Sequence, residues 1–281
     1  MKLDLHPEWA DWIAACRRMV DGIERVLAES PTTVERSVEV GLGEGGDRTL
    51  VIDAAAEEVI FVELAALAAS GLEFTALSEE RGEVGFGSDA VRVVIDPIDG
   101  SLNAKRVSGP CALSLAVAYG ATSADVKFGF VYDFHANEEW VAAAGEGAWL
   151  NGNLLDPNIA SRIRSDGRVE VFGIESADPR LVAAAIEPLV ESAYRLRALG
   201  AIAISLCHVA AARFDAMVSL RGCRSFDAAA AQLIVREAGG LVEFPALAVP
   251  TEAPLDLLPH SPVVAARDAA ALEVARRVTI S

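Results

Sequence analysis

The stretch VRVVIDPIDGSLNAKR, from Val91 to Arg106, ends an apolar, β-rich run with two aspartates that are three residues apart. Pro97 fixes its own backbone angle and favours an extended Asp96, so we expect a sharp turn where the strand ends. Asp96, Asp99 and the carbonyl group of Ile98 can then face one point. Oxygen ligands of this kind are the ones that hard cations such as Mg²⁺ prefer.

The same turn also offers groups that can bind an anion. Gly100 allows the backbone to come close to a ligand, and Ser101 lies where the helix SLNAKRV is expected to begin. A tight turn in which Asp and Ser only cap a helix explains the hexapeptide DPIDGS equally well when it is taken alone. The turn by itself therefore leaves both interpretations open.

Further acidic residues stand where a predicted strand meets a loop or a helix. Glu79 and Glu80 follow the run LEFTAL, Asp53 follows TLVI, and Asp227 begins the alanine-rich helix in SFDAAAAQLIVREAGG. Taken singly, Glu79 and Glu80 would be a solvated charge pair, and Asp53 and Asp227 would be helix N-caps. Such a set, combined with the DPIDGS turn, is hard to explain as coincidental caps, so we expect the acids to share one site.

The composition is that of a globular protein without a general affinity for polyanions. The 281 residues are 52% hydrophobic and 23% charged, which suffices for one large core or two medium ones, and the formal net charge is −17. Nucleic acids and anionic membranes are therefore not expected as partners. An anionic substrate would need local attraction from metal ions, helix N-termini or a few arginines.

Cysteine and histidine are not expected to supply the chemistry. The cysteines form no CxxC pair, so we expect buried thiols rather than a zinc site or a disulfide framework. They are Cys16, Cys111, Cys207 and Cys223. The histidines match no motif and are expected to be structural or surface groups. They are His6, His135, His208 and His260.

The N-terminal half is predicted to combine two helices with a sheet. Apolar residues at helical spacing from Trp9 to Leu27 predict an amphipathic helix, and a second helix is expected over Ala54–Leu67, after the glycine-rich loop GLGEGGDRT. Short β-rich runs between residues 72 and 144 predict one sizeable sheet. The chain shows neither a signal-like N-terminus nor an apolar run of about 18 to 20 residues, which predicts a cytoplasmic protein.

The C-terminal half is predicted to alternate strands and helices from about Ser161 onwards. One of the expected helices is RLVAAAIEPLV, residues 180–190. The turn-rich segment at residues 149–158 is the expected boundary. It divides the chain into an N-terminal α+β domain, 1–152, with most of the candidate metal ligands, and a C-terminal α/β domain, 153–281, with Asp227 and the substrate-specificity loops.

In order and spacing, these motifs resemble the inositol monophosphatase family of Mg²⁺-dependent, lithium-sensitive phosphatases. The matching segments are DRTLVIDAAAEEVI, SEE, VVIDPIDGSLN, GAIAISLCHVAAARFDA and SFDAAAAQLIVREAGG, between about residues 45 and 245. The resemblance implies a layered αβαβα sandwich of the sugar-phosphatase type, α+β in its first half and α/β in its second. It places the site in the cleft between the halves and implies a homodimer.

The resemblance also implies a ligand set for the metal ions. Glu79, Asp96 and the Ile98 carbonyl would hold a first Mg²⁺, and Asp96, Asp99 and Asp227 would hold a second. Two or three Mg²⁺ ions are implied for each site, with Mn²⁺ as a substitute. Two metal ions about 3.5 to 4 Å apart can clamp the attacking and the departing oxygen of an in-line displacement, so no cysteine or histidine nucleophile is needed.

Roles in catalysis and in phosphate binding follow from the same resemblance. Glu79 would act in catalysis as well as in metal binding, and Ser101 would orient the attacking water with support from Asp53. The amides of Gly100 and Ser101 would bind the phosphate, and Asp99 would also face the substrate.

The segments expected to contact the rest of the substrate depart from the family pattern. Leu220 stands where animal-type members carry a glutamate that contacts inositol hydroxyls, and Arg221 follows it. Arg197 and Gly200 lie in RLRALGA, a segment that lines the substrate pocket in relatives. Similar arginine-bearing loops occur in archaeal members that also hydrolyse fructose 1,6-bisphosphate, so Arg221 and Arg197 could hold a second phosphate by bidentate contacts. A solvated surface charge is the alternative for each of them. Arg195, in the same segment, is expected to be a solvated surface charge.

The motifs therefore favour a Mg²⁺-dependent phosphomonoesterase for inositol monophosphate or a related sugar phosphate. Fructose-1,6-bisphosphatase is the alternative that Leu220 and the arginines favour. A nucleotide 3′-phosphatase has no dedicated signal, and a non-catalytic scaffold is not favoured because all the expected acids and Ser101 are present. The segment NAKR, residues 103–106, stands where relatives commonly place an aromatic residue after the Asn; its Lys105 and Arg106 add positive charge near the turn, and their role stays open.

Overall fold

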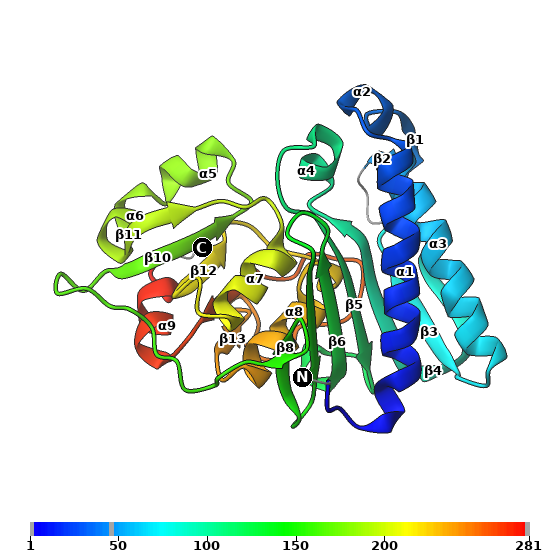
Figure 1. The fold of residues 1–281 in the computed structure, drawn as a ribbon. Helices are drawn as coiled ribbons and strands as arrows, with labels where there is room; N and C mark the ends of the chain where they lie inside the picture. The colour runs from blue at the N-terminus through cyan, green and yellow to red at the C-terminus, as the bar shows by residue number, and fades with distance from the viewer. Residues whose placement is uncertain (1–2, 45–47, 279–281) are drawn as a thin grey trace.

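The computed structural model describes residues 3–44 and 48–278, and its helices and two large sheets form five layers (Figure 1). The order is helices, a seven-stranded sheet, helices, a five-stranded sheet and helices again. The αβαβα sandwich predicted from the sequence is confirmed. The layers follow from helices and sheets that each need to bury an apolar face.

The first layer consists of α1 (Ala10–Glu29) and α3 (Val51–Ala69), which pack against each other and against the seven-stranded sheet. Both helices were predicted, although α3 begins three residues earlier than expected. Pro7 starts the short 3₁₀ helix η1 (Pro7–Trp9) ahead of α1. The elements α2 (Thr33–Arg36), β1 (Glu39–Leu42) and β2 (Arg48–Leu50) were not predicted. Residues 45–47 of the glycine-rich loop lie outside the described residues.

The seven-stranded sheet has the order β3-β4-β5-β6-β7-β8-β9, and β3 pairs with both halves of the long strand β4. Its strands are β3 (Phe74–Ser78), β4 (Gly82–Asp99), β5 (Ala112–Ala118), β6 (Val126–Asp133), β7 (Glu138–Ala143), β8 (Gly147–Leu150) and β9 (Asn153–Leu154). The short 3₁₀ helix η2 (Ser123–Asp125) connects β5 and β6. The helix α4 (Ser101–Arg106) follows β4, so the sequence motif DPIDGS lies at the end of a central strand.

The middle layer consists of α7 (Ile202–Ala210) and α8 (Ser225–Glu237), which are buried between the two sheets. Alanines 228 to 231 are almost fully buried and allow close packing of α8 on the first sheet. At Gly129 of β6, a Cβ atom would lie 2.7 Å from the carbonyl oxygen of Ala230, so a larger residue would push α8 away. The four cysteines are buried free thiols, as predicted.

The five-stranded sheet has the order β11-β10-β12-β14-β13. Its strands are β10 (Val169–Glu175), β11 (Ala193–Arg197), β12 (Ala216–Ser219), β13 (Leu241–Glu243) and β14 (Val264–Ala266). The helices α5 (Pro179–Ala184), α6 (Ile186–Ser192) and α9 (Ala269–Arg276) belong to the last layer. Among the helices of residues 3–44 and 48–278, none offers the apolar length that a bilayer span requires.

The predicted single helix over residues 180–190 is wrong, because the chain forms α5 and α6 with a break at Ala185. Pro188 explains the break. Proline has no N–H to donate to the carbonyl of Ala184, and its ring would clash with that carbonyl in a continuous helix. The edge strand β11 was also not predicted.

Candidate active site between the two sheets

The two aspartates of the DPIDGS turn lie on a β-bulge at the end of β4. Asp96 is opposite Ser114 of β5 and Asp99 is opposite Ala112, so three steps on β4 match two steps on β5. In a regular strand, residues three apart face opposite sides of the sheet. The extra residue of the bulge returns Asp99 to the side of Asp96, and Pro97, which cannot donate a ladder hydrogen bond, lies within it.

Gly100 turns the chain from β4 into α4. Its φ of +84° is in the left-handed region, and a Cβ atom there would lie 2.9 Å from the carbonyl oxygen of Pro110 and 3.1 Å from that of Gly200. Only glycine therefore fits without movement of the backbone. The hydroxyl group of Ser101 donates a hydrogen bond to the Ile98 carbonyl at 2.9 Å, so two groups predicted for the site are in direct contact.

The carboxylate of Asp99 reaches from the first half of the chain to the N-terminus of α7. Its Oδ1 accepts from the amide of Ile202 at 3.2 Å and its Oδ2 accepts from the amide of Ala203 at 2.8 Å. Amides at a helix N-terminus lack partners within the helix and favour negative charge. A carboxylate has about four lone-pair sites, so these two bonds leave further sites for another ligand.

Asp96 and Asp99 lie in an acidic and buried environment. Burial raises the pKa of Asp96 well above its usual value, and the charges of Glu79, Asp99 and Asp227 raise it further. Burial and the charge of Asp227 likewise raise the pKa of Asp99, against the lowering effect of the α7 amides. Carboxylates from three segments of the chain therefore lie close enough to raise the pKa of Asp96, an arrangement that favours bound protons or cations.

Arg224 supplies a positive charge next to two of these acids. Its Nη2 lies 2.9 Å from Oε1 of Glu79, and its backbone N–H donates to Oδ2 of Asp227 at 2.7 Å. Asp227 lies in the first turn of α8, as predicted, and also accepts this capping bond. The guanidinium group is 4.6 Å from the ring centre of Phe226, which helps to hold it in place.

Asp53 lies in the first turn of α3, where its Oδ2 accepts from the amide of Leu50 at 3.2 Å. Its Oδ1 is buried and has no hydrogen-bond partner. Burial raises the pKa of Asp53 to about 7; the Leu50 amide and the charge of Lys105 lower it, and the charge of Glu80 raises it. Lys105, whose role the sequence left open, thus acts electrostatically on Asp53.

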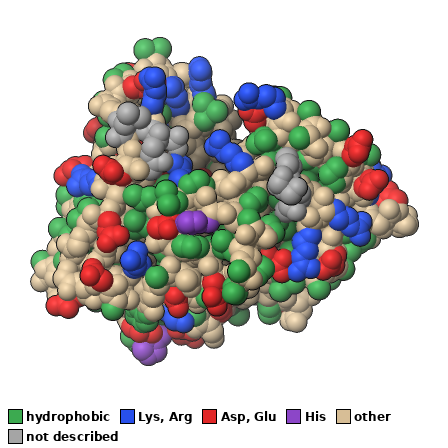
Figure 2. Space-filling model, turned by 180° about the vertical axis from the view of Figure 1, so that it is seen from behind, with side chains coloured by type: hydrophobic (Ala, Val, Ile, Leu, Met, Phe, Trp, Pro, Cys, Tyr) green, Lys and Arg blue, Asp and Glu red, His purple; other side chains and the backbone are tan. Residues whose placement is uncertain are grey.

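A cavity of about 690 Å³ opens beside the acids, between α4 and α5. Its walls include Asp99 and Asp227, together with Gly200 and Arg221, which the sequence assigned to the substrate. Figure 2 shows a hollow at the upper edge of the molecule, between its two lobes, with Lys and Arg side chains around it.

Two positions weighed for the substrate lie away from this cavity. Arg197 does not line it among the described residues; its Nη1 donates to the carbonyl of Leu196 on the exposed edge strand β11. Leu220 is 3% exposed and belongs to the core around the second sheet. Arg195 is exposed and stacks on Tyr194, with its guanidinium 3.9 Å from the ring centre, as expected for a surface charge.

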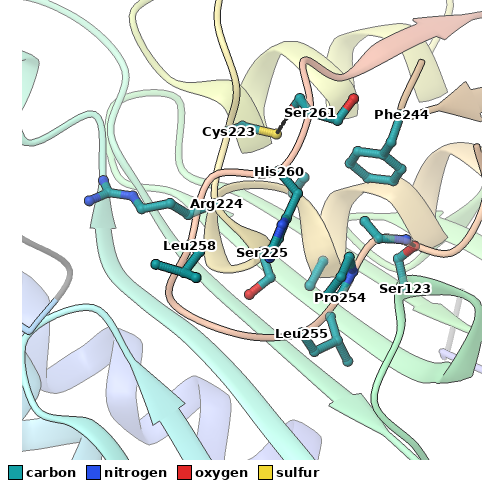
Figure 3. A pocket seen from close by; sticks show the side chains of 13 residues that line it. Ser123, Cys223, Arg224, Ser225, Phe244, Pro254, Leu255, Leu258, His260 and Ser261 are labelled. Carbon is teal, nitrogen blue, oxygen red and sulfur yellow. Dashed lines mark hydrogen bonds between the residues drawn. The ribbon is translucent and has the colours of Figure 1, made fainter. Parts of the chain in front are cut away.

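A second pocket borders the site at Cys223 and Arg224 but is too small for a substrate. It encloses about 10 Å³, roughly the space of one water molecule. Figure 3 shows that the Arg224 side chain extends away from the other labelled residues of this pocket. The larger cavity between α4 and α5 is therefore the better candidate for binding a substrate.

The donor set of the site fits a hard divalent cation. The acids are all oxygen donors. Asp53, Asp96 and Asp99 are buried and Glu79 and Asp227 are partly buried, and Asp53 has an oxygen without a hydrogen-bond partner. In residues 3–44 and 48–278, however, no three Asp, Glu, His or Cys side chains are arranged so that they could hold a metal ion as they stand. Glu79 faces Arg224 and Asp99 faces α7 instead.

Three residues near the site were not singled out from the sequence. Arg224 pairs with Glu79, and Glu57 accepts bonds from the hydroxyl of Ser78 and the amide of Arg81, which flank the turn that carries Glu79. Glu175 ends β10 and is 1% exposed. A carboxylate that ends an apolar strand was the signal used for Asp96, and the same signal could have found Glu175.

Comparison with known proteins assigns most of the chain to one family. The model of the "Inositol monophosphatase family" matches residues 12–280. Over 243 residues, the chain is 30% identical to a fructose-1,6-bisphosphatase/inositol-1-monophosphatase of Methanothermobacter thermautotrophicus, covering 82% of this chain and 83% of the other. Over 242 residues, it is 34% identical to the Nus factor SuhB of Escherichia coli K12, covering 85% of each chain.

A solved structure shares the fold. The crystal structure of an inositol monophosphatase–fructose 1,6-bisphosphatase, 24% identical in sequence, matches with a TM-score of 0.79 over 94% of this chain and 97% of the other. The chain therefore belongs to the inositol monophosphatase family and is a phosphoric monoester hydrolase.

Proposed function

We propose that the chain hydrolyses the phosphate ester of inositol monophosphate or a related sugar phosphate, with Mg²⁺ held by Glu79, Asp96, Asp99 and Asp227 and by the Ile98 carbonyl. The observation that carries this proposal is the convergence of acids from separate segments: Asp96 and Asp99 share one bulge, Asp99 and Asp227 line one cavity, and Arg224 contacts both Asp227 and Glu79. A protein of net charge −17 that gathers further acids in one place needs cations there to attract a phosphate.

When bound, Mg²⁺ would neutralise the carboxylates, polarise the phosphoryl group and lower the pKa of water. The chain's own residues would position the reactants. Ser101, whose hydroxyl is fixed to the Ile98 carbonyl, would orient the attacking water. Asp53, which has a buried oxygen without a hydrogen-bond partner, would support Ser101 in this role.

Loading the site would require a change at Glu79. Its Oε1 accepts from Arg224, and a metal ion bound beside this guanidinium group would be repelled by it, so we expect the acid to exchange the guanidinium group for the metal ion. Asp99 would keep its bonds to α7 and use its remaining lone pairs. Two or three Mg²⁺ ions, replaceable by Mn²⁺, would occupy the site, and lithium sensitivity would accompany them.

Fructose-1,6-bisphosphatase activity is the second candidate. Arg221 lines the cavity that holds Asp99 and Asp227, so a second phosphate could be bound there. Leu220 adds support, because this position carries a buried leucine instead of an acid that could bind inositol hydroxyls. Initial rates on myo-inositol 1-phosphate and on fructose 1,6-bisphosphate, measured in parallel, distinguish the two; a strong preference for the first compound would reject this candidate.

The proposal also covers domains, oligomeric state and location. We propose an N-terminal domain over residues 1–152, a C-terminal domain over 153–281, a homodimer and a cytoplasmic location. The change from the first sheet to the second falls just after the proposed boundary, since β9 still pairs with β8 and ends at Leu154, and β10 begins at Val169.

Phosphate release by Asp96→Asn and Asp99→Asn tests the proposed function. Each variant should lose at least about 100-fold in kcat/KM with Mg²⁺, the scale found when one electrostatic group of a reaction site is removed. Asp215→Asn is the matched control, because Asp215 is also buried and accepts backbone amides but lies at the end of the five-stranded sheet that faces away from Glu175 and the acids. Full phosphate release by the Asp96 and Asp99 variants would exclude the proposal.

A further inference from the structure

Glu175 is a buried carboxylate that the proposed function does not use. It ends β10, is 1% exposed and lines the same cavity as Asp99. Its Oε1 accepts from the amide of Leu199 at 3.0 Å and from the hydroxyl of Ser205 at 2.5 Å, and its Oε2 accepts from the amide of Gly200 at 2.9 Å. All three donors belong to one segment, the turn before α7 and the first turns of that helix.

These donors require a carboxylate. Both oxygens of Glu175 accept hydrogen bonds. Two of the donors are backbone amides, which cannot accept, and the third is the hydroxyl group of Ser205. Glutamine has the same shape but would place an NH₂ group against one of the backbone amides. Because burial disfavours a charge, the pKa of Glu175 is raised, and the hydrogen bonds from these donors oppose that effect.

The segment held by Glu175 is fixed on its other side by the DPIDGS region. The Nδ2 group of Asn103, in α4, donates to the carbonyl of Leu199 at 2.6 Å and to that of Pro110 at 2.8 Å. The backbone of Gly100 approaches Gly200 so closely that a Cβ atom would lie 3.1 Å from its carbonyl oxygen. The turn at 199–201 therefore has little freedom to move relative to Asp99.

The same segment then binds Asp99 directly. Two residues beyond Gly200, the amides of Ile202 and Ala203 donate to the two oxygens of Asp99. The backbone amides of residues 199 and 200 thus bind Glu175, and those of residues 202 and 203, in the same short segment, bind Asp99. A shift of the turn would rotate or release the Asp99 carboxylate, because the short segment transmits movement through rigid peptide units.

We propose that Glu175 is a positioning residue for Asp99, which it orients for metal binding through residues 199–203. This inference rests on the proposed role of Asp99 as a metal ligand. Residues that orient metal ligands typically change metal affinity by 10- to 100-fold when they are replaced. Glu175 would act on the ion held by Asp99 and Asp227 more than on the ion held by Glu79.

Titration with Mn²⁺ and amide hydrogen exchange test this role without measuring turnover. In Glu175→Gln, one Mn²⁺ site should weaken by about 10- to 100-fold, and the amides of residues 199–203 should exchange faster. Asp215→Asn is the matched control: Asp215 is also 1% exposed and accepts the amides of Arg162 and Val171, but at the opposite end of the five-stranded sheet. It should lose thermal stability without either effect.

Three results separate the possible failures. Unchanged Mn²⁺ affinities in Glu175→Gln, with one site lost in Asp99→Asn, would overturn the inference and leave the proposed function intact. Absence of Mn²⁺ binding to the unsubstituted protein would overturn both. If Glu175→Gln does not fold, Ser205→Ala removes one of the donors, and an unchanged Mn²⁺ affinity and exchange rate in that variant would also overturn the inference.

Discussion

Glu79 and Arg224 are 145 residues apart in the chain, yet Oε1 of the first and Nη2 of the second are 2.9 Å apart. The same guanidinium group reaches Asp227, with Nε 4.0 Å from Oδ2. One cation of the protein therefore faces two of the acids that we propose as Mg²⁺ ligands. It partly balances the acidic cluster and competes for it with a metal ion.

Arg224→Gln should make the protein depend more strongly on metal ions. Without the guanidinium group the acids repel one another, so the metal-free variant should lose about 2 kcal/mol of unfolding free energy, and Mn²⁺ should restore most of it. Urea unfolding in EDTA and in Mn²⁺ measures both values. Arg213→Gln, which breaks the ion pair with Glu138, is the control and should lose stability equally in both buffers. The same equal loss in Arg224→Gln would contradict this role.

Asp53→Asn should change how the stability of the metal-free protein depends on pH. The pKa of Asp53 is about 7 in the folded chain against 3.8 ordinarily, so between pH 4 and 7 the folded state binds more protons than the unfolded state. Stability therefore falls as pH rises through this window. The variant lacks this loss and should be more stable at pH 8 by up to ~4 kcal/mol.

The Asp53 experiment needs EDTA throughout, because a bound cation would change the balance. Asn can still accept from the Leu50 amide, so the capping bond is expected to survive. At pH 4, Asp53 of the folded unsubstituted protein is protonated and therefore uncharged, like the asparagine of the variant, so the two proteins should have similar stability. A difference that stays constant from pH 4 to pH 8 would refute the assigned titration.

Gly100→Ala should be destabilising for two reasons that a matched variant separates. The φ of +84° costs a side chain about 1–2 kcal/mol, and the new Cβ would also press against the carbonyl oxygens of Pro110 and Gly200. Gly167 has a φ of +83° with no atom within 4 Å of an added Cβ. Gly167→Ala should therefore show only the backbone effect. Equal losses of unfolding free energy in the two variants would show that the close contact is unimportant.

Arg221→Ala should separate the two candidate substrates. If Arg221 holds a second phosphate, KM for fructose 1,6-bisphosphate should rise by about 10- to 100-fold, the value of a charged hydrogen bond. KM for myo-inositol 1-phosphate should change by less than about 3-fold, because it has no second phosphate. Arg197→Ala is the control and should change neither value, since Arg197 stays outside the cavity wall of the described chain. Equal changes for both substrates would speak against this role of Arg221.

Much of the architecture follows from local patterns in the sequence. Helical spacing from Trp9 to Leu27 predicted α1, and β-rich runs predicted the first sheet, because each pattern reflects one buried face. The break at Ala185 was not predicted, because apolar residues continue at helical spacing on both sides of it. Pro188 was the residue in the sequence that indicated a break. The edge strand β11 was missed because its exposed arginines look like a loop.

The residue types of the site could be predicted from the sequence, but the hydrogen-bond and ion-pair partners of those residues could not. DPIDGS predicted the turn at Gly100, and acids after strands indicated where charge would gather. That Arg224 would pair with Glu79 depends on the packing of α8 against β4, which no local pattern reports. Glu175 likewise meets donors 24 to 30 residues away, and their position depends on the path of the turn before α7.

Anomalous diffraction from crystals that contain Mn²⁺ tests the central claim most directly. The account expects one peak bound by Glu79, Asp96 and the Ile98 carbonyl, and a second bound by Asp96, Asp99 and Asp227, with Arg224 displaced from Glu79. Crystals in which the bond between Arg224 and Glu79 persists and no peak lies among these acids, from protein that releases phosphate under the same conditions, would contradict it.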